Sequence, residues 1–299
     1  MDDVTDGFHT LSDGHRLYWR VDDFTDPWTR APTVLLIHGF AETSEAWRAW
    51  VPHLARDYRV LRIDRRGFGK SDPMPVDFAW SLDRMVDDTV SFIEAHAAPA
   101  THVIGCKIAT PLSIRLAVRR PNLVKSLVLC GGPAAAPNGE PWARHIEEHG
   151  AKSWAAMTMD ARMGPEMPAV AKQWWTEFMG ATHVSTMIGF LRNLAKIDVS
   201  AEVDAIRCPT LVVATDSPYR PLSQVTPWQS RIPNSRLAVI PGAIDPAYLG
   251  DCASPEDFGW IRDPCVRELL GHRHFLAVGQ LDVDLGEQHV EVSDRDAQD

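Results

Sequence analysis

Short, unbroken apolar runs recur along the chain and are separated by longer segments with helical spacing. Unbroken runs such as residues 33–37 are typical of parallel strands that are buried on both faces. The alternating run at residues 15–21 indicates a strand near an antiparallel edge. We expect strands at 15–21, 33–37, 58–63, 103–104, 123–130, 209–215 and 236–240, and helices at 44–54, 82–95, 112–120 and 255–270. This alternation predicts an α/β fold with a doubly wound, mostly parallel sheet.

The pattern changes between residues 134 and 200, where no strand-like run occurs and Trp and Met side chains recur at helical spacing. This composition predicts a helical insertion. Most of its large side chains would hold the insertion together, and a minority would line an apolar pocket. We expect the pocket side chains to be Trp154, Trp174, Trp175, Tyr219 and Tyr248.

Composition narrows the range of partners. A chain of 299 residues with 45% hydrophobic residues can form one large core with an inserted element. Its formal net charge of −10 disfavours nucleic acid and anionic membranes as partners. The first residues lack the charged-then-apolar pattern of a secretory signal and no apolar run reaches membrane length, so we expect neither a leader nor a membrane helix. The five scattered cysteines have no metal-ligand spacing and favour a reduced, cytoplasmic protein. We expect a monomer or homodimer and no metal site.

Residues 102–111 predict a strand, a sharp turn and a helix. Small residues stand at Gly105 and Ala109, which places Lys107 at the centre of the turn. This is the spacing of the G-x-S-x-G nucleophile elbow, whose small residues make room for a strained turn. If Cys106 were the centre, two isoleucines would occupy the crowded flanking positions.

Two further motifs accompany this turn: His38-Gly39-Phe40 after a buried strand, and residues 64–73 with the pattern D-x-R-G-x-G-x-S. Together with the elbow and the order of strands, they resemble the α/β-hydrolase superfamily over residues 8–270. The pattern is closest to enol-lactone hydrolases and carbon–carbon bond hydrolases. The resemblance implies an eight-stranded sheet in a core of residues 1–133 and 201–275, a helical cap at 134–200, and an acidic tail at 276–299. It also implies oxyanion donors at the backbone N–H groups of Phe40 and Ile108.

The chain departs from this superfamily at every position of the catalytic triad. Lys107 stands where the resemblance places the serine, and Asp245 stands where it places the histidine. Pro218 falls at the acid position, with Asp216 two residues earlier. Triad catalysis needs a hydroxyl nucleophile, a base and an orienting acid, so an ordinary serine esterase is not expected. His38, Cys106 and Asp216 are candidates for supporting positions around Lys107 and Asp245.

A lysine paired with a carboxylate favours its charged form. We therefore expect Lys107 to act as a cation that stabilises an oxyanion or enolate, with Asp245 as its carboxylate partner and a possible base. The expected ligand is a small carbonyl compound, and the reaction is of the lyase, decarboxylase, retro-aldol or isomerase type. Three alternatives remain open: a catalytically silent protein that binds a small ligand, a lysine-assisted hydrolase of esters, lactones or carbon–carbon bonds, and an imine mechanism at Lys107. No phosphate-binding or dinucleotide-binding glycine motif is present, so no cofactor is expected.

Overall fold

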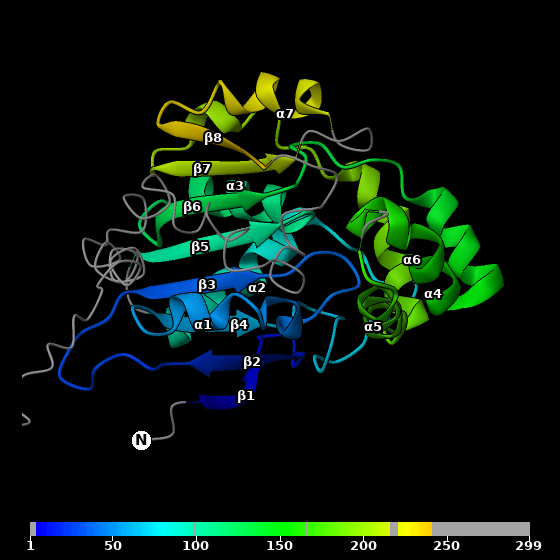
Figure 1. Ribbon diagram of the computed structural model, residues 1–299, viewed down its shortest axis with the longest axis horizontal. Helices are drawn as coiled ribbons and strands as arrows, with labels where there is room; N and C mark the ends of the chain where they lie inside the picture. Colours follow the sequence, from blue (N-terminus) through cyan, green and yellow to red (C-terminus); the bar gives the residue numbers. More distant parts are fainter. Residues whose placement is uncertain (1–3, 98–99, 165–166, 216–220, 241–299) are drawn as a thin grey trace, which may run out of the picture.

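An eight-stranded β-sheet runs through the computed structural model, which describes residues 4–97, 100–164, 167–215 and 221–240 (Figure 1). The strands are β1 (Val4–Thr10), β2 (Arg16–Asp22), β3 (Thr33–Ile37), β4 (Arg59–Ile63), β5 (Thr101–Cys106), β6 (Val124–Cys130), β7 (Thr210–Thr215) and β8 (Ser235–Ile240). Their order in the sheet is β1-β2-β4-β3-β5-β6-β7-β8. Strand β2 is antiparallel to both of its neighbours, and all other neighbouring pairs are parallel. The predicted eight-stranded, mostly parallel sheet is confirmed.

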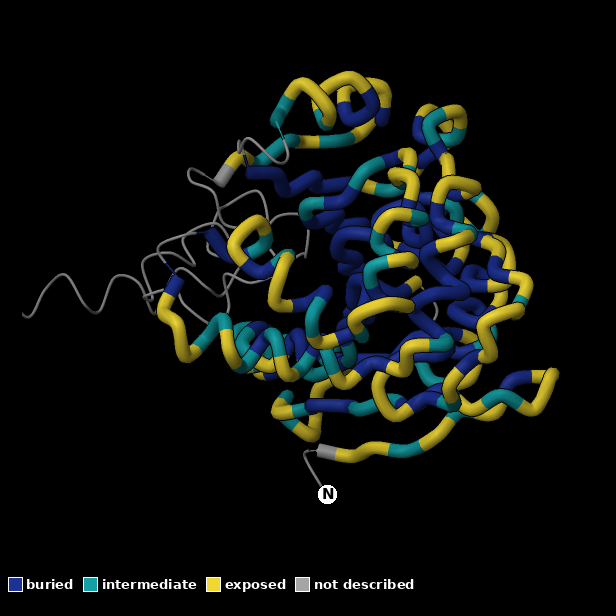
Figure 2. Tube along the Cα trace, turned by 90° about the vertical axis from the view of Figure 1, so that its right-hand side faces the viewer, coloured by how far each residue is buried: buried dark blue, intermediate teal, exposed yellow. Residues whose placement is uncertain are grey.

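Both faces of the central strand β3 are buried, which explains its unbroken run of apolar residues from Val34 to Ile37. Leu35 and Ile37 of β3 join a core that includes side chains of helices α2 (Leu82–His96) and α3 (Ala109–Arg119). The alternate residues Val34 and Leu36 pack in a second core with Trp47, Trp50 and Leu54. Burying an aliphatic side chain of this size contributes about 1.5–3 kcal/mol. Figure 2 shows the buried stretches gathered in the interior of the molecule.

Three helices follow β6 and lie beyond the carboxyl ends of the parallel strands (Figure 1). They are α4 (Glu140–Met163), α5 (Ala169–Gly180) and α6 (Val184–Asn193), and we call them the cap. Helix α4 is interrupted at Gly150, where φ is 85°, so its two halves point in different directions. The cap helices fall inside the segment where the change in composition occurs. Among the helices of the described ranges, none has the length and apolar character needed to cross a membrane.

Several elements differ from the sequence-based expectation. The helix expected at 44–54 is a 3₁₀ turn (Ser44–Trp47) followed by the short helix α1 (Val51–Leu54). A continuous helix would need an N–H at position 52, and Pro52 has none. Strand β1 was not expected because it lies at the sheet edge and lacks a regular apolar pattern. Helix α7 (Leu222–Gln229) was also missed, and it contains Pro227. The helix expected at 255–270 and the acidic tail at 276–299 lie outside the described residues.

Candidate active site

Lys107 occupies a tight turn between β5 and α3. Its φ is 52°, in the left-handed region that a side chain with a Cβ rarely adopts. The turn is closely packed, because a Cβ placed on Gly105 would lie 2.4 Å from Ser113 Oγ and 2.9 Å from the Ala109 carbonyl oxygen. Ala109 is fully buried. The observed geometry is therefore that of a nucleophile elbow centred on Lys107, with small residues where the sequence places them.

Gly105→Ala should destabilise the protein by about 1–3 kcal/mol, because the added methyl group overpacks the elbow. Gly7→Ala is the matched control. It lies on the edge strand β1, where the nearest atom to an added Cβ is a ring carbon of Trp19 at 3.3 Å. Urea unfolding measures the free energy of unfolding of both variants. Equal stability of Gly105→Ala and the wild type would contradict the close packing described for the elbow.

The Lys107 side chain forms a buried ion pair with Glu42. The distance from Lys107 Nζ to Glu42 Oε1 is 2.5 Å, and Lys107 and Glu42 are 5% and 0% exposed. The two residues meet because β3 and β5 are parallel neighbours, with Ile37 paired to Gly105, so the segments after both strands begin at the same edge of the sheet. The expected partner of Lys107 was Asp245, which lies outside the described residues. In the described part of the chain, Glu42 supplies the carboxylate.

The Glu42 carboxyl is ionised at neutral pH. Burial alone would raise its pKa, but the charge of Lys107 and the hydrogen bond from its ammonium outweigh this cost and hold the pKa at about 2. The second carboxylate oxygen accepts a hydrogen bond from the Gly39 backbone N–H at 2.8 Å. Ala41, with φ of 56°, turns the chain between these residues. Glu42 thus links the loop that carries Phe40 to the elbow.

His38 and Arg65 hold the loop that carries Phe40 in place through hydrogen bonds. The Nε2 of His38 accepts from the Arg65 backbone N–H at 2.9 Å, so its Nδ1 carries the proton and donates to the Gly39 carbonyl at 2.8 Å. Burial, and next the nearby Arg65 cation, lower the pKa of His38 to about 3. The Arg65 guanidinium donates to the His38 carbonyl at 3.0 Å and to the Gly39 carbonyl at 2.6 Å. With both ring nitrogens engaged, the neutral His38 holds the loop in place.

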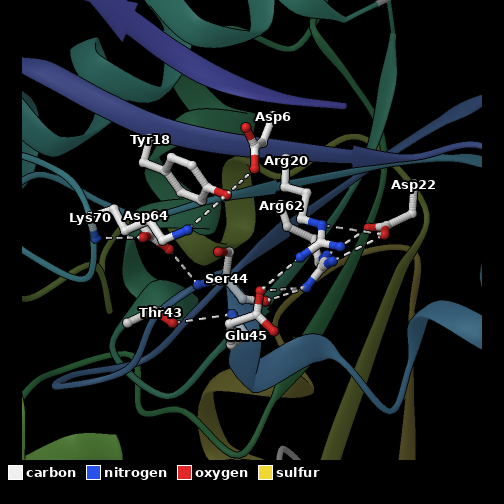
Figure 3. Close-up of polar contacts among 10 residues, drawn as sticks. All are labelled: Asp6, Tyr18, Arg20, Asp22, Thr43, Ser44, Glu45, Arg62, Asp64 and Lys70. Atoms are coloured by element: carbon white, nitrogen blue, oxygen red, sulfur yellow. Dashed lines mark hydrogen bonds and ion pairs between the residues drawn. The ribbon is translucent and has the colours of Figure 1, made fainter. Parts of the chain in front are cut away.

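Asp64 holds the other end of this loop (Figure 3). Its carboxylate accepts from the Ser44 backbone N–H at 2.5 Å and from the Lys70 backbone N–H at 2.8 Å. Arg66, two residues further on, forms separate ion pairs with Asp13 and Asp88. The D-x-R-G turn at residues 64–67 is therefore buried, and its charged groups are satisfied by the loops packed around it.

A cavity of about 460 Å³ opens above Lys107, between the sheet and the cap. Most of its described lining is apolar. Its polar lining side chains are Lys107, Thr158, Arg162, Thr215 and Gln224. Phe40 and Ile108, the residues expected to supply the oxyanion donors, both line it. Ile108 is the residue before the first turn of α3, where helix geometry provides no internal acceptor for the N–H group.

None of the three tryptophans expected in the pocket is among its described lining residues. Trp154 is fully buried and its ring packs edge to face on Phe40, with centroids 5.3 Å apart. Trp175 is buried against Trp174, and Arg48 lies over the Trp174 ring at 5.0 Å. These large rings fill the inside of the cap and its contact with the core, so they do not appear among the described lining residues. Among the described residues, the cap tryptophan that lines the cavity is Trp142, which was not expected at this place.

The other expected site residues fall into two groups, one that the structure describes and one that lies outside the described residues. Cys106 is buried and its Sγ lies 3.6 Å from Glu42 Oε2, below the elbow and outside the described cavity lining. Asp216, Tyr219, Asp245 and Tyr248 lie outside the described residues. Glu42 was missed altogether. The sequence feature that could have pointed to Glu42 is its position five residues after the buried strand β3, which lies beside the elbow strand β5.

Several curated proteins are similar to this chain. RutD of Klebsiella pneumoniae, whose name gives it a provisional role as a carbamate hydrolase, is 27% identical over 72% of this chain and 85% of its own length. Epoxide hydrolase B of Mycobacterium tuberculosis is 33% identical over 36% of this chain and 31% of its own length. Both names describe hydrolases.

Solved structures agree on the fold. A hydrolase from Pseudomonas aeruginosa has a TM-score of 0.76 at 23% identity, over 90% of this chain and 99% of its own. The enol-lactonase from Burkholderia xenovorans has a TM-score of 0.71 at 19% identity, over 78% of this chain and 90% of its own. The sequence pattern of the alpha/beta hydrolase fold matches residues 32–250. With the strand order and the elbow described above, this match shows that the chain belongs to the α/β-hydrolase fold family.

Proposed function

We propose that the protein is an enzyme that acts on a small carbonyl compound, with Lys107 as a fixed cation at the base of the cavity. The observation that carries this proposal is the position of Lys107. It occupies the elbow with φ of 52°, lines the cavity, and is paired with a buried carboxylate. The ammonium would stabilise the negative charge that develops on the substrate oxygen, together with the N–H groups of Phe40 and Ile108.

The ion pair argues for a cation and against a nucleophilic amine. Glu42 is a carboxylate at neutral pH and lies 2.5 Å from Nζ, so the ammonium form of Lys107 is favoured. An imine or acyl intermediate would require the neutral amine. A cation suits reactions in which a carbon–carbon bond breaks and its electrons move to the carbonyl oxygen as an enolate, as in decarboxylation of β-keto acids or retro-aldol cleavage.

A panel of β-keto acids, β-diketones and retro-aldol substrates tests the proposal. The wild-type protein should consume at least one of these compounds. The reaction is run in water labelled at oxygen, and mass spectrometry follows both the loss of the compound and the label in the products. Cleavage without label in a new carboxylate indicates the lyase-type reaction. Label in the product acid indicates instead a lysine-assisted hydrolase, in line with the names of the relatives. If no compound is consumed, the proposed enzymatic role is wrong.

One observation favours a second candidate, a protein that binds a carbonyl ligand without changing it. The Lys107 ammonium already has a buried carboxylate partner, and such a pair can serve structure alone. This candidate predicts saturable binding of panel compounds that are recovered unchanged. The same mass spectrometry separates it from the enzyme.

Cys106→Ala should leave turnover of any active panel compound nearly unchanged, and p-nitrophenyl ester hydrolysis should stay close to background. The thiol is 1% exposed and lies beneath the elbow, away from the described cavity lining. Steady-state rates of the wild type and Cys106→Ala measure this. Strong ester hydrolysis that Cys106→Ala abolishes would show that the nucleophile is the cysteine.

A further inference from the structure

The peptide group between Gly39 and Phe40 connects Arg65 to the cavity lining. Two donors engage its carbonyl oxygen: His38 Nδ1 at 2.8 Å and the Arg65 guanidinium at 2.6 Å. Its N–H belongs to Phe40, which lines the cavity. This N–H has no hydrogen-bond acceptor in the part of the chain that the structure describes. Because the carbonyl and the N–H of a trans peptide point to opposite sides, the Phe40 N–H is directed away from Arg65.

Arg65 is a buried cation whose hydrogen-bond partners among the described residues are all neutral. It is 4% exposed, and its guanidinium donates to the carbonyls of His38 and Gly39. It also contacts the Met85 sulfur at 3.8 Å, and its guanidinium carbon lies 4.7 Å from the centre of the Phe68 ring. Burial lowers the pKa of Arg65 to about 10, so the side chain is still charged at neutral pH.

A cation on the carbonyl side of a peptide group strengthens the donor on the other side. Linked hydrogen bonds polarise one another, bonds from a charged donor are stronger than neutral ones, and a buried setting increases both effects. With Arg65 and His38 bonded to the Gly39 oxygen, the Phe40 N–H carries more positive charge than an ordinary amide. The two bonds also fix the plane of the peptide group. Arg65 therefore acts on the expected oxyanion donor through one peptide group.

We infer that Arg65 is a positioning residue that makes the base of the cavity selective for a ligand oxygen with negative charge. It acts through the Gly39–Phe40 peptide and is not among the described lining residues. The ligands that fit are carboxylates and enolates with an apolar body, which would contact Trp142 and Leu191 of the lining. The inference rests on the proposed function in placing the ligand oxygen beside the Phe40 N–H.

Binding of phenylacetate and of its neutral counterpart phenylacetamide tests the inference without requiring turnover. The probes share a ring and differ in the charge of the group placed at the Phe40 N–H. Isothermal titration calorimetry should show that the wild type binds phenylacetate more tightly. Arg65→Gln should lower the ratio of the two affinities about tenfold, equal to about 1.4 kcal/mol, while affinity for phenylacetamide stays within about threefold. Arg65→Lys keeps the charge and should retain most of the ratio.

Arg144→Gln is the matched control. It removes the same charge from helix α4, where the Arg144 side chain is 67% exposed, and it should leave the ratio unchanged. Amide NMR of the wild type, labelled at phenylalanine, gives an independent measurement. Phenylacetate should move the Phe40 amide proton downfield more than phenylacetamide does, and the signal is identified by its loss in Phe40→Leu. If Arg65→Gln does not fold, this measurement and Arg65→Lys decide.

Several results would overturn the inference. They are equal affinity of the wild type for both probes, no binding of phenylacetate, an unchanged ratio in Arg65→Gln, an equal loss of both affinities in that variant, a ratio in Arg65→Lys as low as in Arg65→Gln, and a Phe40 signal that does not respond to phenylacetate. A ratio that falls as expected, in a protein that consumes no panel compound, would support the role of Arg65 and reject only the proposed chemistry. Turnover with an unchanged ratio would reject only the inference.

Discussion

Lys107→Met is expected to lower turnover of the active panel compound by about 10²- to 10³-fold. This is the usual cost in kcat of removing one group that stabilises the developing oxyanion. Methionine keeps most of the length of the side chain, being one atom shorter, but cannot carry the charge. Steady-state kinetics should show the loss in kcat more than in KM, because the ammonium acts most strongly on the charge formed in the transition state.

Two further variants exclude a loss of folding as the cause. Lys125→Met removes an exposed lysine on β6 and should retain wild-type kinetics. The double variant Lys107→Met with Glu42→Gln removes both charges of the buried pair. It should recover stability relative to Lys107→Met but no turnover. Full activity in either protein that carries Lys107→Met would refute the role assigned to Lys107.

Glu42→Gln is expected to lower the free energy of unfolding at neutral pH by about 3–5 kcal/mol, because it removes the carboxylate charge from the buried ion pair with Lys107. The matched control is Glu45→Gln. Glu45 lies three residues further along, its side chain is 46% exposed, and its ion pairs with Arg20 and Arg62 are longer than 3.2 Å. Chemical unfolding measures both variants. A cost of Glu42→Gln no greater than that of Glu45→Gln would contradict the strength assigned to the buried pair.

The effect of Glu42 should also depend on pH in one direction. Its pKa in the folded protein is about 2, below the ordinary value of 4.5. A carboxyl with a depressed pKa stabilises the fold fully above its unfolded pKa, and this contribution is lost as pH falls through the folded value. The difference in unfolding free energy between wild type and Glu42→Gln should therefore be constant above about pH 5 and shrink toward pH 2. A difference that grows on acidification would mean that the pKa of Glu42 is raised.

The elbow could be predicted from the sequence because the residues that it requires are close together in the chain. Gly105 and Ala109 are small where the backbone of the turn and Ser113 come within contact distance, and this requirement is visible in five consecutive residues. The same holds for the central strand β3, which is apolar from Val34 to Ile37 because both of its faces are covered. Prediction from local sequence missed the edge strand β1, which has no regular side-chain pattern. It also predicted one continuous helix where Pro52 divides a periodic segment.

The partner of Lys107 could not be obtained in the same way. A lysine can pair with any carboxylate that the fold brings near, and Glu42 is separated from it by 65 residues. Alignment with the superfamily pattern pointed to Asp245, which lies outside the described residues. The pairing with Glu42 depends on β3 and β5 being neighbours and on the turn at Ala41, and neither is encoded near Lys107.

The sequence by itself determined the fold family, the position of Lys107 at the elbow and the helical character of the segment before β7. These follow from short-range rules of periodicity, turn geometry and residue size. Tertiary structure alone decided that Glu42 is the described partner of Lys107, that Trp142 lines the cavity while Trp154 packs behind Phe40, and that Lys107 and Arg162 line the same cavity. These depend on how distant elements pack, because a helix sequence shows which side chains share a face but not what that face will meet.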